Sequence, residues 1–498
     1  MSSTLPPDVL SPNNPIRHDT VTDILEKLGV TVPLQDVEVY TSLLEGIWEV
    51  WNNVEQMGDY VPDVDENRFP RQEVHRATAA ENVANAWAWK CVIKDTKPNH
   101  GLLAGRTICL KDTIAVKGVP CLLGTDMIKD WVPNTDATIT TRILEAGGVI
   151  TGKGVCENLC LWGLSNSAAT GGSSSGTAVC VGLGLADLGV GGDQGGSIRL
   201  PCCVNGLVGL KPTFGLVPYT GIASMEPMLD FAGPMTRVSP SRVDGIDDRQ
   251  AAGTPFPAEV PDYPSMAKLG VLGLKVGIIT ESLDQPMHDD RVSKLLVRAA
   301  EALRSLGAAE VSMVSIPMHK IAPELWAVPG RMGGTSSFLA RSSGRRGLAL
   351  NDLTDKMLPL TQDKVDGMFP SGINMLVNGL WAFEHLSPSL RDAYLTALSK
   401  YDVLITPTLP FLAPKLPPEG ASIAENMSRN LGLSTNTSAF NLTGLPALTL
   451  PVGRLESLEG DGALLPVGMQ IIGKNFAEPT LFRVAYAWEQ AHNWVNFG

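Results

Sequence analysis

Three segments of the chain carry residues whose types suit nucleophilic catalysis. Lys111 ends an apolar run, Ser173 lies among glycines and serines, and Ser197 follows two glycines. The two serines are 24 residues apart. A serine hydroxyl becomes a nucleophile when a nearby base takes its proton, and a lysine can be that base if its amine is neutral. Together the three segments predict acyl transfer by a serine that uses lysine as its base.

The residues before Ser197 predict an oxyanion hole made of main chain. Gly195 and Gly196 have no side chains, so consecutive backbone N–H groups can point toward one position. The donors would be the N–H groups of Gln194, Gly195, Gly196 and Ser197. Such donors stabilise the negative oxygen of a tetrahedral intermediate. Two glycines alone more often mark a tight turn, so this interpretation depends on the other two segments.

Three other glycine patterns point to different chemistry, and each is incomplete. Residues 147–153 nearly match a phosphate-binding loop, but Gly154 stands where a magnesium-binding hydroxyl is needed, so we expect a plain turn. Residues 182–184 lack the third glycine of a dinucleotide fingerprint. Residues 172–176 match a nucleophile elbow, but polar residues precede them where a buried strand is needed. That elbow also requires a histidine, and we expect all seven histidines to be structural or superficial: His18, His75, His100, His288, His319, His385 and His492.

The composition predicts a large acidic globular protein. The 498 residues carry a net charge of −13, which argues against nucleic acid or an anionic membrane as a direct partner. Residues 1–19 lack the basic start and apolar run of a signal peptide, and no later stretch is long and apolar enough to cross a bilayer. The eight cysteines lie between Cys91 and Cys203, at spacings that fit neither a zinc site nor a disulfide framework. We therefore expect a cytoplasmic protein with buried, reduced thiols and no metal.

The hydrophobic pattern at the start of the chain predicts helices. Residues 20–28 should form one helix, ended by Gly29, and residues 35–57 a longer one. One face of the longer helix is apolar and must be covered by the main body or by a second subunit. That face consists of Tyr40, Leu44, Ile47, Trp51 and Val54. A third helix is expected over residues 77–92.

From residue 102 onward, short apolar runs alternate with glycines, which is typical of an α/β domain. The runs are 106–110, 138–146 (a helix), 148–151 and 178–188. A strand at 274–279, a helix at 289–306 and a strand at 310–316 predict a βαβ unit with parallel strands. The helix should bury Val292, Leu295, Leu296, Ala299 and Leu303. The end of the chain predicts strands at 403–406, 447–450 and 468–472 and a helix at 479–492.

The three catalytic segments together resemble the amidase signature family of serine hydrolases. The match includes Lys111 in Leu-Lys-Asp, Ser173 in Gly-Gly-Ser-Ser and Ser197 in Gly-Gly-Ser-Ile-Arg, at the family's spacing of 24 between the serines. It continues through residues 209–215, 230–235, 401–408, 442–447 and 466–470. The sequence Gly-Gly-Asp-Gln-Gly-Gly-Ser is most similar to the motif of broad-substrate bacterial amidases that carry an N-terminal helical segment.

The resemblance implies the fold and the domain organisation. The expected fold is α/β, a mixed β-sheet core sandwiched by α-helices, with an N-terminal helical segment. That segment would span residues 1–75 and could dimerise. The amidase signature domain would span residues 76–498 and form a variable substrate pocket or cap from about 255–400.

The resemblance also implies the reaction, which is hydrolysis of a small-molecule amide to acid and ammonia or amine, without a cofactor. Ser197 would form the acyl-enzyme and Lys111 would be the base. Ser173, which lies on a cis peptide in this family, would relay the proton between them. A lysine acts as a base only when neutral, a form that burial among hydroxyl groups favours. The expected oxyanion and substrate-binding residues are Gln194, Gly195, Gly196 and Ser174. Asp193 and Arg199 are expected to form a buried structural pair.

Two departures from the family pattern leave alternatives open. The loop before Gly171 is short, and Ser175 stands where the family usually has glycine. A polar segment, residues 238–250, replaces an apolar helix. These changes are compatible with a weak or inactive amidase-like binding protein. A glutamine-dependent amidotransferase subunit is a further alternative, which the N-terminal helices and the acidic charge disfavour.

Overall fold

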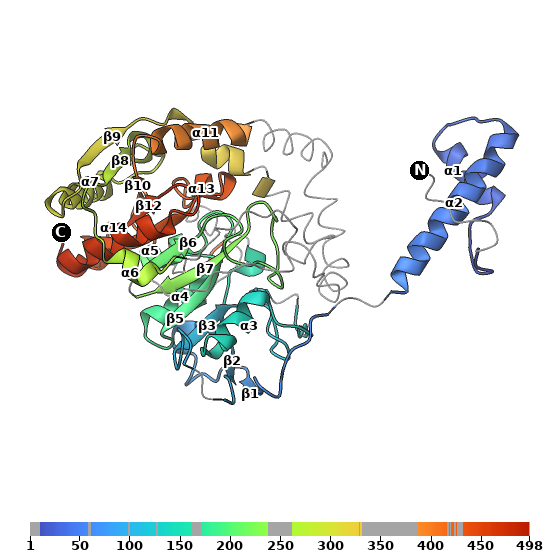
Figure 1. The fold of residues 1–498 in the computed structure, drawn as a ribbon, viewed down its shortest axis with the longest axis horizontal. Helices are drawn as coiled ribbons and strands as arrows, with labels where there is room; N and C mark the ends of the chain where they lie inside the picture. The colour runs from blue at the N-terminus through green and yellow to red at the C-terminus, as the bar shows by residue number, and fades with distance from the viewer. Residues whose placement is uncertain are drawn as a thin grey trace. The chain divides into compact units, whose positions relative to one another are not determined.

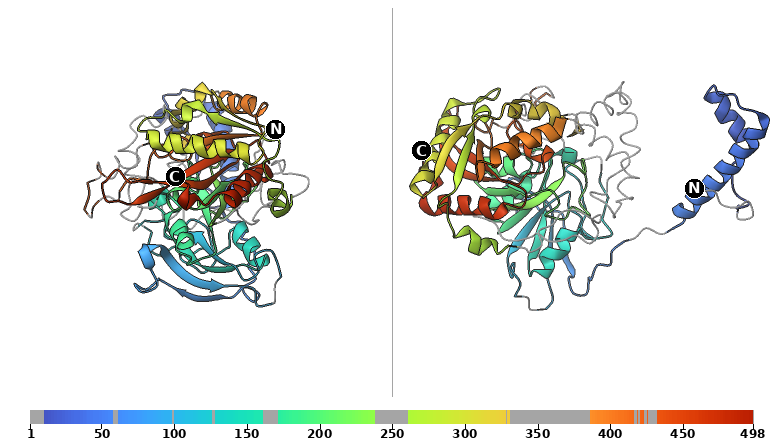
Figure 2. Two further views of the ribbon diagram at one scale, coloured as in Figure 1. Left: turned by 90° about the vertical axis from the view of Figure 1, so that its left-hand side faces the viewer. Right: turned by 45° about the horizontal axis from the view of Figure 1, so that its top comes forward.

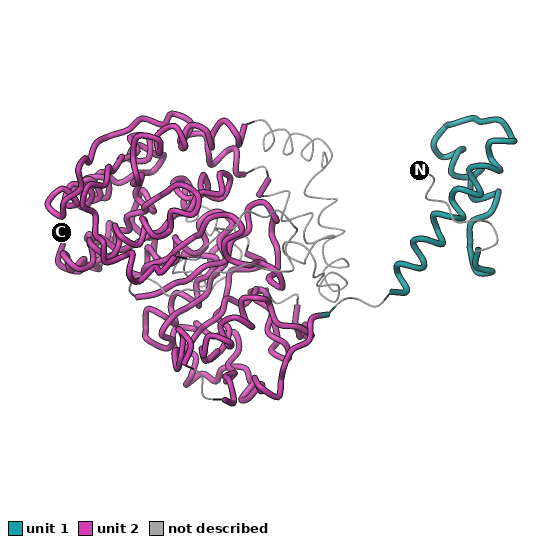
Figure 3. Tube along the Cα trace, in the orientation of Figure 1, with its two compact units in different colours: residues 1–61 teal, residues 62–498 magenta. Residues whose placement is uncertain are grey.

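The computed structural model describes residues 10–57, 61–97, 100–125, 128–160, 171–237, 261–327, 329–330, 386–415, 418, 420–422, 425 and 432–497. The chain forms two compact units, residues 1–61 and 62–498 (Figure 3). The short loop before Gly171, the polar segment 238–250 and much of the expected pocket region 255–400 lie outside the described residues. None of the described helices has both the length and the apolar character that crossing a membrane requires.

The described part of the smaller unit contains the two predicted helices, α1 (His18–Lys27) and α2 (Leu34–Glu55). Gly29 follows α1 with a φ of 66°, a conformation that glycine adopts readily at a helix C-terminus. Four of the five residues of the predicted apolar face of α2 are exposed, and Trp51 is 74% exposed. Such a row of exposed apolar residues marks an interaction surface more often than an ordinary helix face.

The larger unit is built on a mixed sheet that has 12 strands in the described residues, in the order β1-β2-β4-β3-β5-β7-β6-β11-β12-β10-β8-β9. The strands are β1 (Arg71–His75), β2 (Trp87–Ile93), β3 (Thr107–Lys111), β4 (Val149–Gly154), β5 (Leu188–Asp193), β6 (Val208–Lys211), β7 (Phe231–Thr236), β8 (Lys275–Ile279), β9 (Glu310–Val314), β10 (Val403–Pro407), β11 (Ala447–Glu456) and β12 (Leu464–Ile472). In Figure 1 the sheet runs from β1 and β2 at the bottom of this unit to β8 and β9 at the top.

Helices cover both faces of the sheet (Figure 2). Successive side chains of each strand point to opposite faces, so both faces carry apolar side chains that the helices bury. Val403 and Ile405 pack with α7 (Asp290–Ser305) and α14 (Glu478–Ala491), whereas Leu404 between them packs with α11 (Ser387–Leu398) and α13 (Ser438–Leu442). At the other end of the sheet, α3 (Thr138–Glu145) and α4 (Ser175–Gly182) occupy opposite faces in the same way. The predicted sandwich of helices around a mixed sheet is confirmed.

The predicted βαβ unit is confirmed in its elements and its pairing. Strands β8 and β9 pair in parallel, and α7 connects them. All five side chains of α7 that were expected to face inward are buried. The helix begins after Asp289, whose carboxylate accepts a hydrogen bond from the N–H of Arg291 at 2.9 Å, a standard N-cap contact.

The prediction of a helix over residues 77–92 is wrong. Residues 83–85 form a short 3₁₀ turn, and β2 follows, paired with β1 on one side and β4 on the other. Alanines in this stretch favour a helix locally, but Trp87, Cys91 and Ile93 recur at even spacing and are buried. Pairing with two neighbouring strands outweighed the local preference. Residues 147–153 are also more than a turn, since all but the first two belong to β4.

Candidate active site

Lys111 is the last residue of β3, on the face of the sheet that α4 covers. Alternation along the strand directs Ile108 and Leu110 toward the core with α3 and leaves Cys109 on the opposite face. Lys111 is fully buried, and its Nζ donates to Ser173 Oγ at 2.7 Å and to the Gly192 carbonyl at 3.3 Å. Both of these partners are uncharged, and the Cys160 thiol, whose pKa is lowered, also hydrogen-bonds to Lys111 and Ser173. A neutral amine at this position can accept a proton from Ser173.

Ser173 and Ser174 lie immediately before α4, and the Gly172–Ser173 peptide bond is cis. The hydroxyl of Ser174 donates to the Gly192 carbonyl at 3.1 Å and accepts from the Gly192 N–H at 3.2 Å. The N–H of Ser174 donates to the Ser197 carbonyl at 3.3 Å. These contacts attach the serine cluster to both β5 and the Ser197 loop. Ser175, at the position where glycine is usual, is the first residue of α4 and is accommodated there.

The Ser197 loop connects β5 to α5 (Arg199–Val204), and its two glycines are required by space and backbone conformation. A Cβ on Gly195 would lie 2.6 Å from the Trp326 ring. Gly196 has a φ of 137°, and a Cβ there would overlap Thr437. The Gly196 N–H donates to Asp193 Oδ1 at 2.8 Å, which leaves Gln194, Gly195 and Ser197 as the candidate oxyanion donors.

The three candidate catalytic residues are not all in direct contact with one another. Lys111 and Ser173 are in direct contact, and the Ser197 backbone hydrogen-bonds to the residue after Ser173. The hydroxyl of Ser197 makes no hydrogen bond to any residue in the described part of the chain. It is therefore not engaged with Ser173 in this structure, and a relay between the two serines requires a small movement or a bound substrate. Apo active sites often show such loose geometry.

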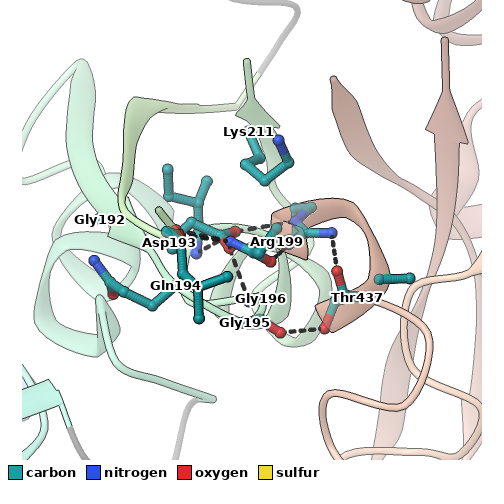
Figure 4. Close-up of polar contacts among 12 residues, drawn as sticks. Gly192, Asp193, Gln194, Gly195, Gly196, Arg199, Lys211 and Thr437 are labelled. Atoms are coloured by element: carbon teal, nitrogen blue, oxygen red, sulfur yellow. Dashed lines mark hydrogen bonds and ion pairs between the residues drawn. The ribbon is translucent and has the colours of Figure 1, made fainter. Parts of the chain in front are cut away.

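Asp193 and Arg199 form the buried pair that the sequence predicts (Figure 4). Both side chains are fully buried, and Arg199 donates to both carboxylate oxygens at 2.9 and 3.0 Å. Burial acts to raise the pKa of Asp193, but the charge and hydrogen bonds of Arg199 outweigh it and hold the pKa well below its usual range. The guanidinium also donates to three groups from the C-terminal part of the chain: the Thr437 carbonyl, Asn441 Oδ1 and Gln470 Oε1.

Gln194 is held by two aromatic residues that the sequence did not indicate. Trp326 Nε1 donates to the Gln194 carbonyl at 2.7 Å, and Gln194 Nε2 donates to the Tyr219 hydroxyl at 2.8 Å. The side chain of Gln194 extends away from Arg199 (Figure 4). The Gln194 amide oxygen is buried and has no hydrogen-bond partner in the described part of the chain. These contacts fix the backbone at the start of the Ser197 loop.

A buried carboxyl group beside Ser173 was also missed by the sequence analysis. Glu157 is 3% exposed, and its N–H donates to the Ser173 carbonyl at 3.2 Å. Burial raises the pKa of Glu157 to about 7, and the charge of Lys111 acts in the opposite direction. One signal could have found it. Strands β3 and β4 are parallel, with Lys111 opposite Gly154, so residues just after Gly154 lie at the same edge of the sheet as Lys111.

Comparisons with known proteins show the family to which the chain belongs. The family described as Amidase matches residues 71–482. An enantioselective amidase of Rhodococcus rhodochrous is 35% identical over 463 residues, which cover 83% of this chain and 84% of that protein. A glutamyl-tRNA(Gln) amidotransferase subunit of Halobacterium salinarum is 33% identical, covering 78% of this chain and 96% of that protein.

Solved structures show the same fold. The native peptide amidase of Stenotrophomonas maltophilia is 27% identical, with a TM-score of 0.61 over 80% of this chain and 85% of that chain. The corresponding glutamyl-tRNA(Gln) amidotransferase subunit of Thermotoga maritima is 23% identical, with a TM-score of 0.60 over 86% and 88%.

Proposed function

Because the chain belongs to the amidase signature family of serine hydrolases, we propose that it hydrolyses a small carboxylic acid amide with Ser197 as nucleophile, Ser173 as proton relay and Lys111 as base. The contact between Lys111 Nζ and Ser173 Oγ carries this proposal. A fully buried lysine that hydrogen-bonds to a fully buried serine hydroxyl, beside a glycine-rich nucleophile loop, has the parts that a lysine-based serine hydrolase needs.

The proposed reaction proceeds through an acyl-enzyme. Ser197 Oγ attacks the amide carbonyl carbon, and as the C–O bond forms its proton passes through Ser173 to Lys111. The carbonyl oxygen becomes an oxyanion that accepts hydrogen bonds from backbone N–H groups among Gln194, Gly195 and Ser197. When the C–N bond breaks, Lys111 returns the proton through Ser173 to the leaving nitrogen, which departs as ammonia or amine. Water then hydrolyses the acyl-enzyme by the same steps and releases the acid.

A test that separates this function from its alternatives is hydrolysis of a panel of primary amides by the purified chain. We expect ammonia and the corresponding acid in equal amounts, with no partner protein added. Ammonia from free glutamine alone would favour the amidotransferase alternative. If the protein folds but neither releases ammonia nor reacts with a fluorophosphonate probe, an inactive binding protein is favoured. The enantioselective amidase matches 83% of this chain at 35% identity, against 78% at 33% identity for the Halobacterium protein, which favours hydrolysis.

The N-terminal helices and the location of the protein are further proposals. We propose that the segment 1–75 dimerises through the exposed face of α2, whereas 76–498 carries catalysis and forms its pocket from the region 255–400. Light scattering tests the dimer, and a mass of one chain would contradict it. The eight cysteines are all free and seven are buried, which supports a cytoplasmic location.

A further inference from the structure

Glu157 lies at the point where the candidate base and the proton relay meet. It follows β4 directly and precedes the 3₁₀ turn Asn158–Cys160. Its N–H donates to the Ser173 carbonyl, and its carboxyl group lies against Gly172, so that a Cβ on Gly172 would overlap it. Backbone and side chain of Glu157 therefore contact both residues of the Gly172–Ser173 peptide, whose serine hydroxyl accepts from Lys111.

The carboxyl group of Glu157 is unlike other buried carboxyl groups of this chain. Asp193 is paired with Arg199, Asp112 with Lys153 at 3.2 Å, and the Glu478 carboxylate accepts from the Thr213 N–H. Glu157 Oε2, in contrast, is buried and has no hydrogen-bond partner among the described residues. A buried carboxylate oxygen without a partner is costly, so packing alone does not explain this group.

We propose that Glu157 is a positioning residue of the amidase reaction, whose charge determines how readily Lys111 gives up its proton. The proposal rests on the proposed function, because it requires Lys111 to act as the base. An anionic Glu157 stabilises the ammonium form of Lys111, and a neutral Glu157 does not. An anionic Glu157 therefore moves the loss of the Lys111 proton to higher pH, and removing that charge makes the neutral base form more readily.

The groups that act on Glu157 are few in the described part of the chain. Lys111 from β3 lowers its pKa and the Cys160 thiol raises it, both less strongly than burial does. The hydrogen bond with Cys156 is the largest influence that lowers the pKa of the Cys160 thiol. Burial raises that pKa, and the charge of Lys111 and hydrogen bonds with Ser173 and Lys111 lower it further. Because Lys111 is the cation in this set, replacing the carboxyl group should act first on Lys111.

The test is the pH dependence of kcat/KM for wild type and Glu157→Gln, which removes the charge and keeps the size. The acid limb of the profile reports formation of the neutral base. Without a carboxylate nearby, that limb should move to lower pH by about one to three units, the usual effect of one close charge. Glu478→Gln is the matched control, since Glu478 is also buried and has a raised pKa, caused by burial, but hydrogen-bonds to Thr213. Its profile should coincide with that of wild type.

An acid limb that stays in place in Glu157→Gln would overturn the inference, while loss of turnover in Ser197→Ala would still support the proposed function. If Ser197→Ala keeps full turnover, the proposed function itself fails. If the Glu157→Gln protein does not fold, the test is instead an infrared titration of the protonated carboxyl band of Glu157 in wild type and Lys111→Met. Without the lysine charge, that band should persist to higher pH, and an unchanged titration would overturn the inference.

Discussion

Replacing Ser197 by alanine is expected to lower kcat for amide hydrolysis roughly 10⁶-fold, the loss measured when a serine hydrolase loses its nucleophile. The variant has no hydroxyl to form the acyl-enzyme, so covalent labelling by a fluorophosphonate should disappear as well. Its unfolding midpoint should stay near that of wild type, because the Ser197 hydroxyl makes no hydrogen bond within the described residues. Turnover and labelling are measured on the same purified sample.

The base is tested in the same assay with Lys111→Met. Loss of a general base costs about 10²- to 10⁴-fold in rate, so labelling of this variant should be slow but detectable. The difference between slow labelling and none distinguishes the base from the nucleophile. Labelling that is undiminished in Lys111→Met would contradict the assignment of Lys111, and labelling that survives in Ser197→Ala would place the nucleophile elsewhere.

Replacing Arg199 by methionine is expected to lower the free energy of unfolding by about 3–5 kcal/mol, the cost of leaving one charge of a buried pair without its partner. The Asp193 carboxylate would stay buried next to the nucleophile loop, and the contacts of Arg199 with Thr437, Asn441 and Gln470 would be lost. Urea denaturation of wild type and variant measures the difference as a shift of the midpoint.

The control for this prediction is an exposed ion pair of the same chain. Lys320 Nζ lies 2.7 Å from Asp284, and both side chains are exposed. Lys320→Met should leave the free energy of unfolding nearly unchanged, since water solvates the carboxylate that remains. Equal losses in the two variants would mean that the Asp193–Arg199 pair does not hold the loop. A folded Arg199→Met protein with full activity would show that the loop keeps its shape without the pair.

The parts of the fold that could be predicted are those whose apolar residues recur at short, regular intervals along the chain. The apolar side chains of α7 recur at helical spacing, and the two strands that flank it are short apolar runs. Strand β2 was missed because its alanines favour a helix, and only its two neighbours, β1 and β4, make the extended form more stable. The sequence contains no local sign that β2 lies between β1 and β4, so this pairing could not be predicted.

The candidate site also contains some residues that local sequence motifs identify and others that they do not. Lys111, Ser173 and Ser197 could be selected because each lies in a recognisable local motif. Glu157 belongs to no motif, and its position beside Ser173 follows from the parallel pairing of β3 with β4. The hydrogen bond from the Gly196 N–H to Asp193 likewise depends on the three-dimensional shape of the loop. Residue type predicted the chemistry, and the sheet determines which further groups take part.

The hydrogen bonds of Arg199 to the C-terminal part of the chain also set an order of events during synthesis. Its most distant partner, Gln470, comes 271 residues later, so at about 5–20 residues per second a ribosome needs roughly 15–50 s to add it. During that time the nascent chain already contains the nucleophile, while the guanidinium lacks its acceptors on α13 and β12. The site is therefore completed late, when the strands encoded last insert into the middle of the sheet between β6 and β8.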